Sequence, residues 1–353
     1  MPPARATATT GQLRLATGAP ALVSPASPGQ RDPALQAKLE ELIKRNGLEG
    51  AGVSLRNLET GTFAAVNEQA SFGSASTIKV PLMAAVMQLV EAGKLDLSQQ
   101  VTVKASNVTR TWEPPGDKRP ILRGGERVTV EHLVDLMISR SDNTATNTLM
   151  DLVDRNAVAA GFGSLGMPRT QLGKKLYWGN RVPDTPRGAG QNVTTAGDMA
   201  QLFQRIADGT AVSPGASEKM RGWLRGQLDH DKIARGLPPG ATFYGKSGET
   251  SKVTHDVGIV EVGGQRYVLA VMTKMNVDNS NVQQRIAGLS RDLLGAMQAQ
   301  SAATARAQQA PAAAPPAGVP VVAAAPLTAE PAPAVAAAPV PLPTAPAQAA
   351  PAT

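Results

Sequence analysis

The 353-residue sequence contains no cysteine. This absence excludes a disulfide scaffold, a zinc site built on thiolates and a cysteine nucleophile. No run of eighteen apolar residues occurs either, so no membrane-spanning helix is expected. The N-terminus carries one arginine, Arg5, but no clear apolar segment follows it, and a standard signal peptide is not recognisable. Composition therefore leaves the cellular compartment open.

Aromatic residues are also few, at 3% of the chain, and the formal net charge is +7. The basic residues are mixed with acidic ones and form no arginine-rich helix interleaved with aromatic side chains. Recognition of nucleic acid needs such a concentrated basic surface, so the composition favours a basic protein with no nucleic-acid partner. The three histidines are far apart and form no His-Glu-x-x-His pattern, which argues against a zinc enzyme. We expect no metal and no organic cofactor.

Both ends of the chain lack the apolar surface that folding requires. Residues 301–353 hold twelve prolines and twenty-three alanines, with Arg306 and Glu330 as their only charges. Such a composition predicts a disordered, partly polyproline-II tail over 299–353. Residues 1–32 are rich in Ala, Pro, Thr and Gly and are predicted to be disordered as well. The interval 33–298 is long enough for one domain with a sizeable core.

Hydrophobic periodicity within this interval predicts strands near both of its ends and helices between them. The expected strands are 51–58, 62–66, 241–246, 254–262 and 266–274. The expected helices are 34–46, 76–95, 129–139, 142–154, 195–208, 214–228 and 280–298, with 161–194 as loop. The simplest fold is of the α+β class, with one antiparallel five-stranded sheet flanked by the terminal helices. Its sheet lobe would span 33–70 and 213–298, and an inserted helical lobe would span 71–212.

Ser76-Thr77-Ile78-Lys79 is the first pattern that suggests chemistry. A serine at a helix N-terminus lies where free backbone N–H groups favour a developing oxyanion. A lysine three residues later lies on the same helix face, so its amine can reach the serine hydroxyl. The amine can act as a base only if burial or a neighbouring cation lowers its pKa. Taken alone, the tetrapeptide also fits an ordinary helix start with an exposed lysine.

Two further patterns follow in the chain. Ser141-Asp142-Asn143 comes after an apolar helix and could relay a proton and hold a substrate amide, or could simply cap the next helix. Lys246-Ser247-Gly248 stands at the end of an expected strand and could bind a carboxylate beside an oxyanion hole, or could be a polar turn. A helix start, a helix cap and a polar turn each explain one of the three patterns when that pattern is taken alone. None of them explains why the three patterns occur together in this order.

The three patterns together resemble the class A β-lactamases and their penicillin-binding relatives, whose signature is Ser-x-x-Lys, Ser-Asp-Asn and Lys-Thr/Ser-Gly. The separations of 65 and 105 residues between their first members are similar to those of that family. The resemblance covers about 33–298 and implies a catalytic Ser76 activated by Lys79, with Ser141 as proton relay. It also implies substrate contacts from Asn143, Lys246, Ser247 and Gly248, and an oxyanion hole made by the backbone N–H groups of Ser76 and Glu249.

The sequence departs from this family in the loop after the second pattern. Active class A β-lactamases carry Glu-x-x-x-Asn there, and the glutamate activates the water that hydrolyses the acyl-enzyme. No glutamate occurs between Glu131 and Glu218. Alignment on the end of that loop puts Gly179 or Asn180 at the position of the glutamate, and Asp184 is the acid that could replace it. Without a general base, whose contribution is roughly 10²–10⁴-fold, deacylation should be slow and acyl-enzyme should accumulate.

Smaller departures concern charge around the site. His255-Asp256 stand where the family usually has an arginine, and Lys252 is a candidate substitute. The Glu249 side chain should disfavour anionic substrates unless it points away from the oxyanion hole. Glu113, in Trp112-Glu113-Pro114-Pro115, precedes the second pattern and is set aside as a catalytic acid. The dinucleotide-type pattern Gly161-x-Gly-x-x-Gly166 follows a helix rather than a strand and is expected to be an inter-helix loop.

Three functions remain open at this point. The first is a serine β-lactamase that opens β-lactams through a Ser76 acyl-enzyme and turns over slowly. The second is a D,D-peptidase or penicillin-binding protein that acts on D-alanyl peptides of the cell wall, and the third is a non-catalytic wall-associated module. The resemblance implies a monomer in the periplasm or outside the cell, because cell-wall peptides and β-lactams are found there.

Overall fold

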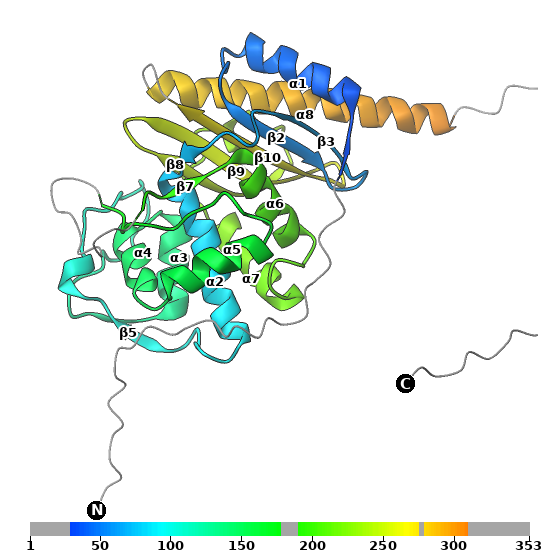
Figure 1. The fold of residues 1–353 in the computed structure, drawn as a ribbon. Coiled ribbons are helices and arrows are strands. Elements are labelled where there is room, and N and C mark those ends of the chain that lie inside the picture. Colours follow the sequence, from blue (N-terminus) through cyan, green and yellow to red (C-terminus); the bar gives the residue numbers. More distant parts are fainter. Residues whose placement is uncertain (1–28, 178–189, 275–278, 310–353) are drawn as a thin grey trace, which may run out of the picture. The chain divides into compact units, whose positions relative to one another are not determined.

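The computed structural model describes residues 29–177, 190–274 and 279–309. Its main sheet has six strands in the order β1-β3-β2-β10-β9-β8 (Figure 1). These are β1 Gln30–Arg31, β2 Gly52–Asn57, β3 Thr62–Val66, β8 Thr242–Glu249, β9 Val253–Val262 and β10 Gln265–Lys274. The five expected strands are all present and pair antiparallel. β1 adds a short parallel edge strand to β3, from residues that composition alone predicts to be disordered.

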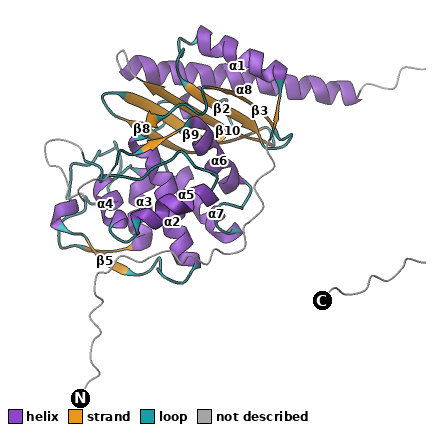
Figure 2. Cartoon of the chain, viewed as in Figure 1, coloured by secondary structure: helices purple, strands orange, loops and turns teal. Residues whose placement is uncertain are grey.

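Two helices cover one face of this sheet. They are α1 Pro33–Arg45 and α8 Asn279–Gln309, and both lie on the same side of the strands (Figures 1 and 2). Asp32 caps the start of α1 by accepting from two backbone N–H groups, and Gly47 ends it with a left-handed φ of +64°. Leucine and isoleucine side chains of α1 and α8 pack on β2 and β10 to form one of the two buried apolar clusters.

The opposite face of the sheet carries the helical lobe (Figure 2). At its centre lies α2 Lys79–Glu91, ten of whose thirteen residues are buried. Around it pack α3 Val130–Ser139, α4 Asn143–Met150, α5 Arg155–Ser164, α6 Ala196–Ala207 and α7 Pro214–Arg225. Two short strand pairs are also present: β4 Phe72–Gly73 pairs with β7 Val193–Thr194, and β5 Gln100–Thr102 pairs with β6 Arg127–Thr129. The 3₁₀ turns are η1 Ala75–Ile78, η2 Ala105–Asn107 and η3 Ala234–Gly236.

The structure differs from the expected elements in several places. The helix expected over 76–95 is a 3₁₀ turn followed by α2, which ends at Glu91. The helix expected over 142–154 ends at Met150, and a separate helix, α5, runs to Ser164. The Gly161–Gly166 pattern is therefore the last turn of α5 and its cap, with Gly166 at φ +80°, and is not an open loop. Helix α8 continues to Gln309, past the expected boundary at 298, because its alanine-rich end lacks proline until Pro311.

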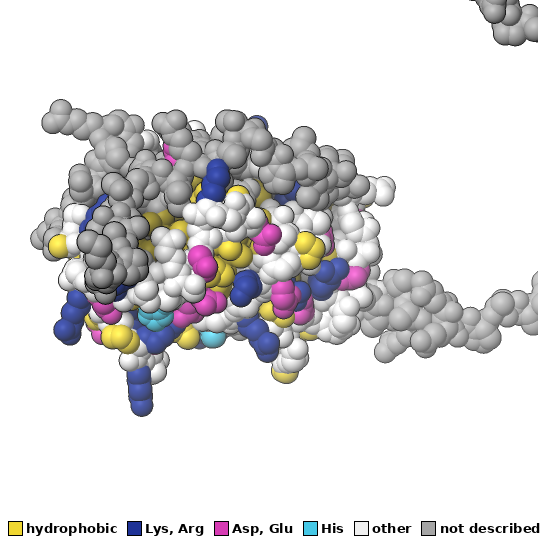
Figure 3. Space-filling view, turned by 90° about the horizontal axis from the view of Figure 1, so that it is seen from below, with side chains coloured by type: hydrophobic (Ala, Val, Ile, Leu, Met, Phe, Trp, Pro, Cys, Tyr) yellow, Lys and Arg dark blue, Asp and Glu magenta, His cyan; other side chains and the backbone are white. Residues whose placement is uncertain are grey.

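The chain divides into two units between Ala305 and Arg306. The sheet, the helical lobe and the three sequence patterns belong to the first unit. Residues 1–28 and 310–353, most of the segments predicted to be disordered, lie outside the described residues. On the face of the helical lobe seen in Figure 3, basic and acidic side chains lie interspersed among neutral ones.

Candidate active site

The 3₁₀ turn η1 presents Ser76 directly before α2. Ala75 takes a left-handed φ of +45°, which is uncommon outside glycine, and so turns the chain sharply between β4 and η1. The Thr77 N–H then donates to the Ser74 carbonyl oxygen over 3.1 Å. Ser76 keeps part of its surface exposed, whereas Lys79, the first residue of α2, is fully buried. A reactive hydroxyl is thus reachable from solvent while its neighbouring amine is not.

The Lys79 amine is the point at which the first two patterns meet. Its Nζ donates to Ser76 Oγ over 3.0 Å, to Ser141 Oγ over 2.9 Å and to Asn143 Oδ1 over 2.8 Å. The Ser141 carbonyl oxygen lies 2.7 Å from the same nitrogen. Both serine hydroxyls are therefore within proton-transfer distance of one amine.

Burial controls the protonation of Lys79. Removal from water lowers its pKa well below the ordinary lysine value, and the positive charge of Lys246 lowers it further, while Asp142 opposes the shift. Both effects favour the neutral amine, whose nitrogen can accept the proton of Ser76. The effect of Lys246 on this pKa also shows that the third pattern lies near the first two.

In the second pattern, Asp142 has a structural role, whereas Ser141 and Asn143 contact the Lys79 amine. Asp142 caps α4, since its Oδ1 accepts from the Ala145 N–H over 2.9 Å and its Oδ2 pairs with the buried Arg140 over 3.1 Å. Ser141 takes a left-handed φ of +60°, a strained conformation that turns its hydroxyl toward Lys79. The helix-cap explanation holds for Asp142, and Ser141 and Asn143 face the amine.

The third pattern lies inside β8 and not at a strand end before a loop. β8 continues to Glu249, with Lys246, Ser247 and Gly248 paired to β9. A Cβ on Gly248 would lie 2.9 Å from the Thr77 nitrogen and 3.0 Å from the Ser76 nitrogen, closer than real Cβ atoms come. Only glycine lets the strand lie against the backbone of η1 at this position.

Lys246 and a second lysine put positive charge beside this strand. Lys246 is buried, which lowers its pKa to about 8, and its Nζ donates to the Ser247 carbonyl oxygen over 3.0 Å. The second lysine, Lys232, is 1% exposed and pairs with Asp229 over 2.7 Å and with Glu249 over 3.5 Å. Sequence reasoning missed Lys232 because a single lysine in a loop matches no pattern, whereas the candidate Lys252 is exposed.

The Glu249 carboxylate is already engaged with other side chains. Its Oε2 accepts from Gln283 Nε2 over 3.0 Å and lies 3.5 Å from the Lys232 amine. Lys232 pairs more closely with Asp229, so it offsets the negative charge of Glu249 only in part and reduces the repulsion of anionic substrates expected from the sequence to that extent.

His255 and Asp256 supply no cation in place of the family's arginine. Both are fully buried on β9. Burial lowers the pKa of His255 to about 4, and its ring bonds the Gly73 carbonyl oxygen and the Thr273 N–H, so it is neutral at physiological pH. Asp256 is an acid whose pKa burial raises to about 7.

Comparison with known proteins agrees with this geometry. A model of the Beta-lactamase enzyme family matches residues 34–297. The chain belongs to this family. It is 27% identical over 269 residues to a beta-lactamase of Rhodobacter capsulatus, covering 75% of this chain and 89% of that protein. It is 25% identical over 287 residues to the beta-lactamase regulatory protein BlaB of Streptomyces cacaoi, covering 69% and 90%.

Solved structures give the same result. A mutant of PBP-A, solved as an acyl-enzyme complex with penicillin G, superposes with a TM-score of 0.66 at 27% identity, covering 78% of this chain and all of that one. A beta-lactamase from Sphaerobacter thermophilus superposes with a TM-score of 0.64 at 30% identity, covering 74% and 98%. The α+β fold expected from the sequence, with a helical lobe inserted into a sheet lobe, is confirmed.

The family's loop after the second pattern begins at a well-anchored residue, Leu176. The Asn147 side chain holds it by donating to the Leu176 carbonyl oxygen and accepting from its N–H, both over 2.8 Å. Asn147 lies one turn after Asn143 on α4, so Leu176 is fixed close to the residues around Lys79. Leu176 also stands four residues before Asn180, so a register that puts Asn180 at the asparagine of Glu-x-x-x-Asn puts Leu176 at the glutamate, in place of the Gly179 or Asn180 given by alignment on the end of the loop. Gly179, Asn180 and Asp184 themselves lie outside the described residues.

Other candidate features do not join the site. Glu113 is exposed, and no hydrogen bond or ion pair links it to the described residues of the three patterns. Within 29–177, 190–274 and 279–309, no group of three or more His, Cys, Asp or Glu side chains could hold a metal ion. Among the helices of these ranges, none combines the length and apolar character of a membrane span.

Proposed function

We propose that this protein is a serine acyl-transfer enzyme whose Ser76 is acylated by β-lactams and which hydrolyses the acyl-enzyme slowly. The observation that supports it most strongly is the fully buried Lys79 amine, hydrogen-bonded at once to Ser76, Ser141 and Asn143. An ordinary helix-start lysine would be exposed and unpaired with a neighbouring serine. This arrangement instead provides a nucleophile, its base and a proton relay.

Acylation would need a base, an oxyanion hole and a proton relay. Neutral Lys79 takes the proton of Ser76 Oγ as that oxygen attacks the lactam carbonyl carbon, and the carbonyl oxygen becomes an oxyanion. The backbone N–H groups of Ser76 and Glu249 stabilise it, and loss of one such donor costs about 3 kcal/mol of barrier. The carbon–nitrogen bond then breaks, and the proton returns from Lys79 through the Ser141 hydroxyl to the leaving nitrogen.

Substrate would be held by charge and by amide contacts. Lys246 and Ser247 on β8 bind the substrate carboxylate, while Lys232 offsets the nearby carboxylates of Asp229 and Glu249. The Asn143 Oδ1 accepts from Lys79, so its Nδ2 remains as a donor for the carbonyl oxygen of the substrate side-chain amide.

Slow hydrolysis follows from the anchored loop. No glutamate occurs between residues 132 and 217, and Leu176 occupies the position that matches the family's glutamate. The solved relative PBP-A was captured as an acyl-enzyme with penicillin G, which supports acylation by a penicillin but does not bear on the base, because the captured variant carries a glutamate in place of a leucine. We infer that water near a Ser76 ester lacks a general base in this chain, unless Asp184 reaches it.

Two reagents test this proposal. A chromogenic cephalosporin should give a burst of about one equivalent of colour followed by slow turnover, because acylation outpaces hydrolysis. A fluorescent penicillin should leave a persistent covalent label that Ser76→Ala abolishes. Rapid turnover would contradict slow hydrolysis, and labelling that survives in Ser76→Ala would contradict the nucleophile. Absence of both colour and label would favour a non-catalytic, wall-associated module.

The leucine at position 176 also favours a second function, a D,D-peptidase acting on D-alanyl peptides of the cell wall. A transpeptidase-like enzyme needs a long-lived acyl-enzyme rather than a fast hydrolytic base. Release of D-alanine from a peptide ending in D-Ala-D-Ala, faster than hydrolysis of a penicillin, would identify this activity. Either substrate implies a protein in the periplasm or outside the cell, which fractionation of the source cells would test, and the monomer expected from the resemblance would be tested by its mass in solution.

A further inference from the structure

An acidic side chain, Asp229, lies beside the residues that the proposed function assigns to the substrate carboxylate. Its Oδ2 lies 2.7 Å from the Lys232 amine, and its side chain is 21% exposed, so it can be reached from solvent. Gln227 fixes it beside β8, because the Gln227 amide donates to the Asp229 carbonyl oxygen over 3.0 Å and accepts from the Ser247 N–H over 2.7 Å. Asp229 is therefore held next to Ser247.

The Asp229 carboxylate interacts with the same groups that a substrate carboxylate would use. Burial raises its pKa, but the charge of Lys232 and hydrogen bonds from the side chains of Lys232 and Ser247 outweigh burial and lower the pKa, so the group is ionised at neutral pH. Its charge also acts on Lys246, where it opposes the lowering of the pKa that burial causes. Both lysines and the serine of this part of β8 thus already have an anion beside them.

Lys232 does not need Asp229 for charge balance. Burial lowers the pKa of Lys232, but the charges of Asp229, Asp256 and Glu249 outweigh it and raise the pKa. The Glu249 Oε2 lies 3.5 Å from the amine. One carboxylate would neutralise a single ammonium group, and here three carboxyl groups act on it.

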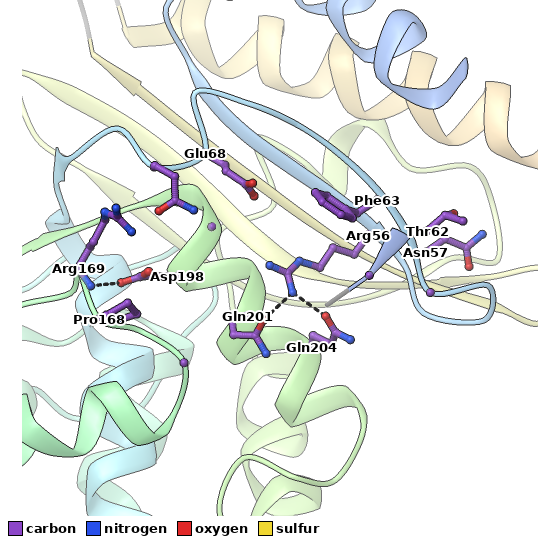
Figure 4. A pocket seen from close by; sticks show the side chains of 15 residues that line it. Arg56, Asn57, Thr62, Phe63, Glu68, Pro168, Arg169, Asp198, Gln201 and Gln204 are labelled. Carbon is purple, nitrogen blue, oxygen red and sulfur yellow. Dashed lines mark hydrogen bonds between the residues drawn. The ribbon is translucent and has the colours of Figure 1, made fainter. Parts of the chain in front are cut away.

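Elsewhere in the sheet lobe a cation is held without any carboxylate. The half-buried Arg56 on β2 donates from Nη1 to Gln201 Oε1 over 2.8 Å and to Gln204 Oε1 over 2.7 Å (Figure 4). It forms no ion pair within 4.0 Å among the residues that the structure describes. Neutral amides can therefore hold a cation in this fold, and the reachable acid beside Lys232 is a feature of the site rather than a requirement of folding.

The charges around this part of β8 leave none over for an anion. Lys232 and Lys246 carry two positive charges. Asp229 and Glu249 balance them, and the buried Asp256 adds negative charge when it ionises. We propose that Asp229 determines specificity: it selects acyl donors whose leaving group carries a neutral carboxamide at this position, as an internal peptide bond does, over donors with a free carboxylate. This inference rests on the proposed function only in taking β8 as the surface that holds the leaving group.

A carboxamide suits both kinds of group at this position. Its N–H can donate to Asp229 Oδ1, whose contact with the Asp231 N–H is long at 3.3 Å, and its oxygen can accept from the Lys246 amine. A carboxylate instead faces the negative charge of Asp229, and juxtaposed like charges weaken binding. Benzylpenicillin, which carries a carboxylate, therefore reacts with Ser76 against this charge.

Binding to Ser76→Ala protein tests the proposal, because this variant forms no acyl-enzyme at residue 76. Isothermal titration calorimetry compares benzylpenicillin with its α-carboxamide, which should bind at least as tightly. Adding Asp229→Asn should tighten the binding of benzylpenicillin by about tenfold or more and change that of the carboxamide by less than about threefold. A purely structural role for Asp229 would move both affinities in the same direction.

Matched variants keep the outcomes distinct. Asp231→Asn removes an exposed negative charge from the same loop and should change neither affinity by more than about twofold. If Asp229→Asn does not fold, Glu249→Gln, which removes the more distant carboxylate from Lys232, should tighten benzylpenicillin by about threefold and decides alone.

Acylation of the unmutated chain, followed by its mass, tests the proposed function separately, since the binding comparison does not need a reactive Ser76. Equal tightening of both compounds by Asp229→Asn, no tightening of benzylpenicillin, or binding of neither compound to any variant would overturn the role of Asp229 in specificity.

Discussion

At the scale of single residues, the chemistry depends on one amine that water does not reach. Lys79 contacts both serines of the site and the Asn143 amide, and each of these contacts is shorter than or equal to 3.0 Å. Burial and Lys246 both favour its neutral form. The same lysine on an exposed helix start would stay protonated and could not take a proton from Ser76.

Replacing this amine tests its role as base. Lys79→Met keeps the length of the side chain but removes the proton acceptor, so acylation by a fluorescent penicillin should slow by about 10²–10⁴-fold. Circular dichroism should show a folded protein, because methionine fills the space of the lysine side chain and adds no charge. The control Lys219→Met, on the exposed surface of α7, should label at the wild-type rate. Equal labelling rates for the two variants would exclude Lys79 as the base.

A second residue-scale prediction concerns the loop anchored by Asn147. Leu176→Glu should place a carboxylate where the family's general base stands and should speed release of the penicillin label, by up to about 10²–10⁴-fold. Leu176→Gln introduces a side chain of the same shape as glutamate but with no basic carboxylate, so it should release the label at the wild-type rate. The loss of label over time after removal of free penicillin measures both rates. Equal release from the two variants would show that residue 176 is not the position of the base.

At the scale of elements, the site depends on the close contact of β8 with η1. Gly248→Ala would put a methyl group about 3.0 Å from the Ser76 nitrogen, so the strand or the 3₁₀ turn must move. We expect a fall in acylation rate of about tenfold or more, because the oxyanion hole opens by a few tenths of an ångström. Penicillin labelling rates measure this directly.

The control for this change is another glycine. Gly222 lies within α7, and a methyl group added there would meet nothing within 4 Å, so Gly222→Ala should label normally. It should also stabilise the protein by about 1 kcal/mol, measured by urea unfolding, since alanine favours the helix. A Gly248→Ala variant that labels as fast as Gly222→Ala would show that the close contact of β8 with η1 does not matter for acylation.

Elements and site residues differed in how far the sequence could predict them. Ser76, Lys79, Ser141 and Asn143 could be named because each belongs to a short pattern, and the structure brings them together around one amine. Lys232 could not be named, since it acts through its position beside Glu249, whereas Leu176 was missed because the loop was aligned on its end and not on the spacing from Leu176 to Asn180. The boundary between α4 and α5 was missed because it carries no proline or glycine between Asp151 and Asn156.

At the scale of the whole molecule, buried ionisable groups behind β8 link stability to pH. Asp256 is fully buried, its Oδ1 has no hydrogen-bond donor among the described residues, and burial raises its pKa to about 7 although Lys232 and Lys246 oppose the shift. In the unfolded chain the same carboxyl titrates near pH 4. The folded state therefore binds more protons than the unfolded state between pH 4 and 7, and this group's contribution to stability is lost as the pH rises through that window.

Asp256→Asn removes this titration. The variant should be more stable than the wild type at pH 8, by at most about 4 kcal/mol, and the gain should shrink toward zero at pH 4. The contribution of His255 to stability changes with pH in the opposite direction, because its pKa is lowered to about 4. In Asp256→Asn no titrating Asp256 offsets this contribution, so the stability of the variant should fall as the pH falls from 6.5 to 4. Urea unfolding at pH 4–8 measures both trends, with the exposed Asp231→Asn as control. A gain that is constant with pH, or largest in acid, would contradict the role assigned to the buried acid.

The most direct test of Ser76 as the acylated nucleophile is the mass of the intact protein after reaction with benzylpenicillin. We predict that the chain gains the mass of one penicillin, that a proteolytic peptide containing Ser76 carries it, and that the adduct persists after free penicillin is removed. Ser76→Ala should gain no mass. An unmodified wild-type chain, or an adduct mapped to any residue other than Ser76, would contradict this mechanism.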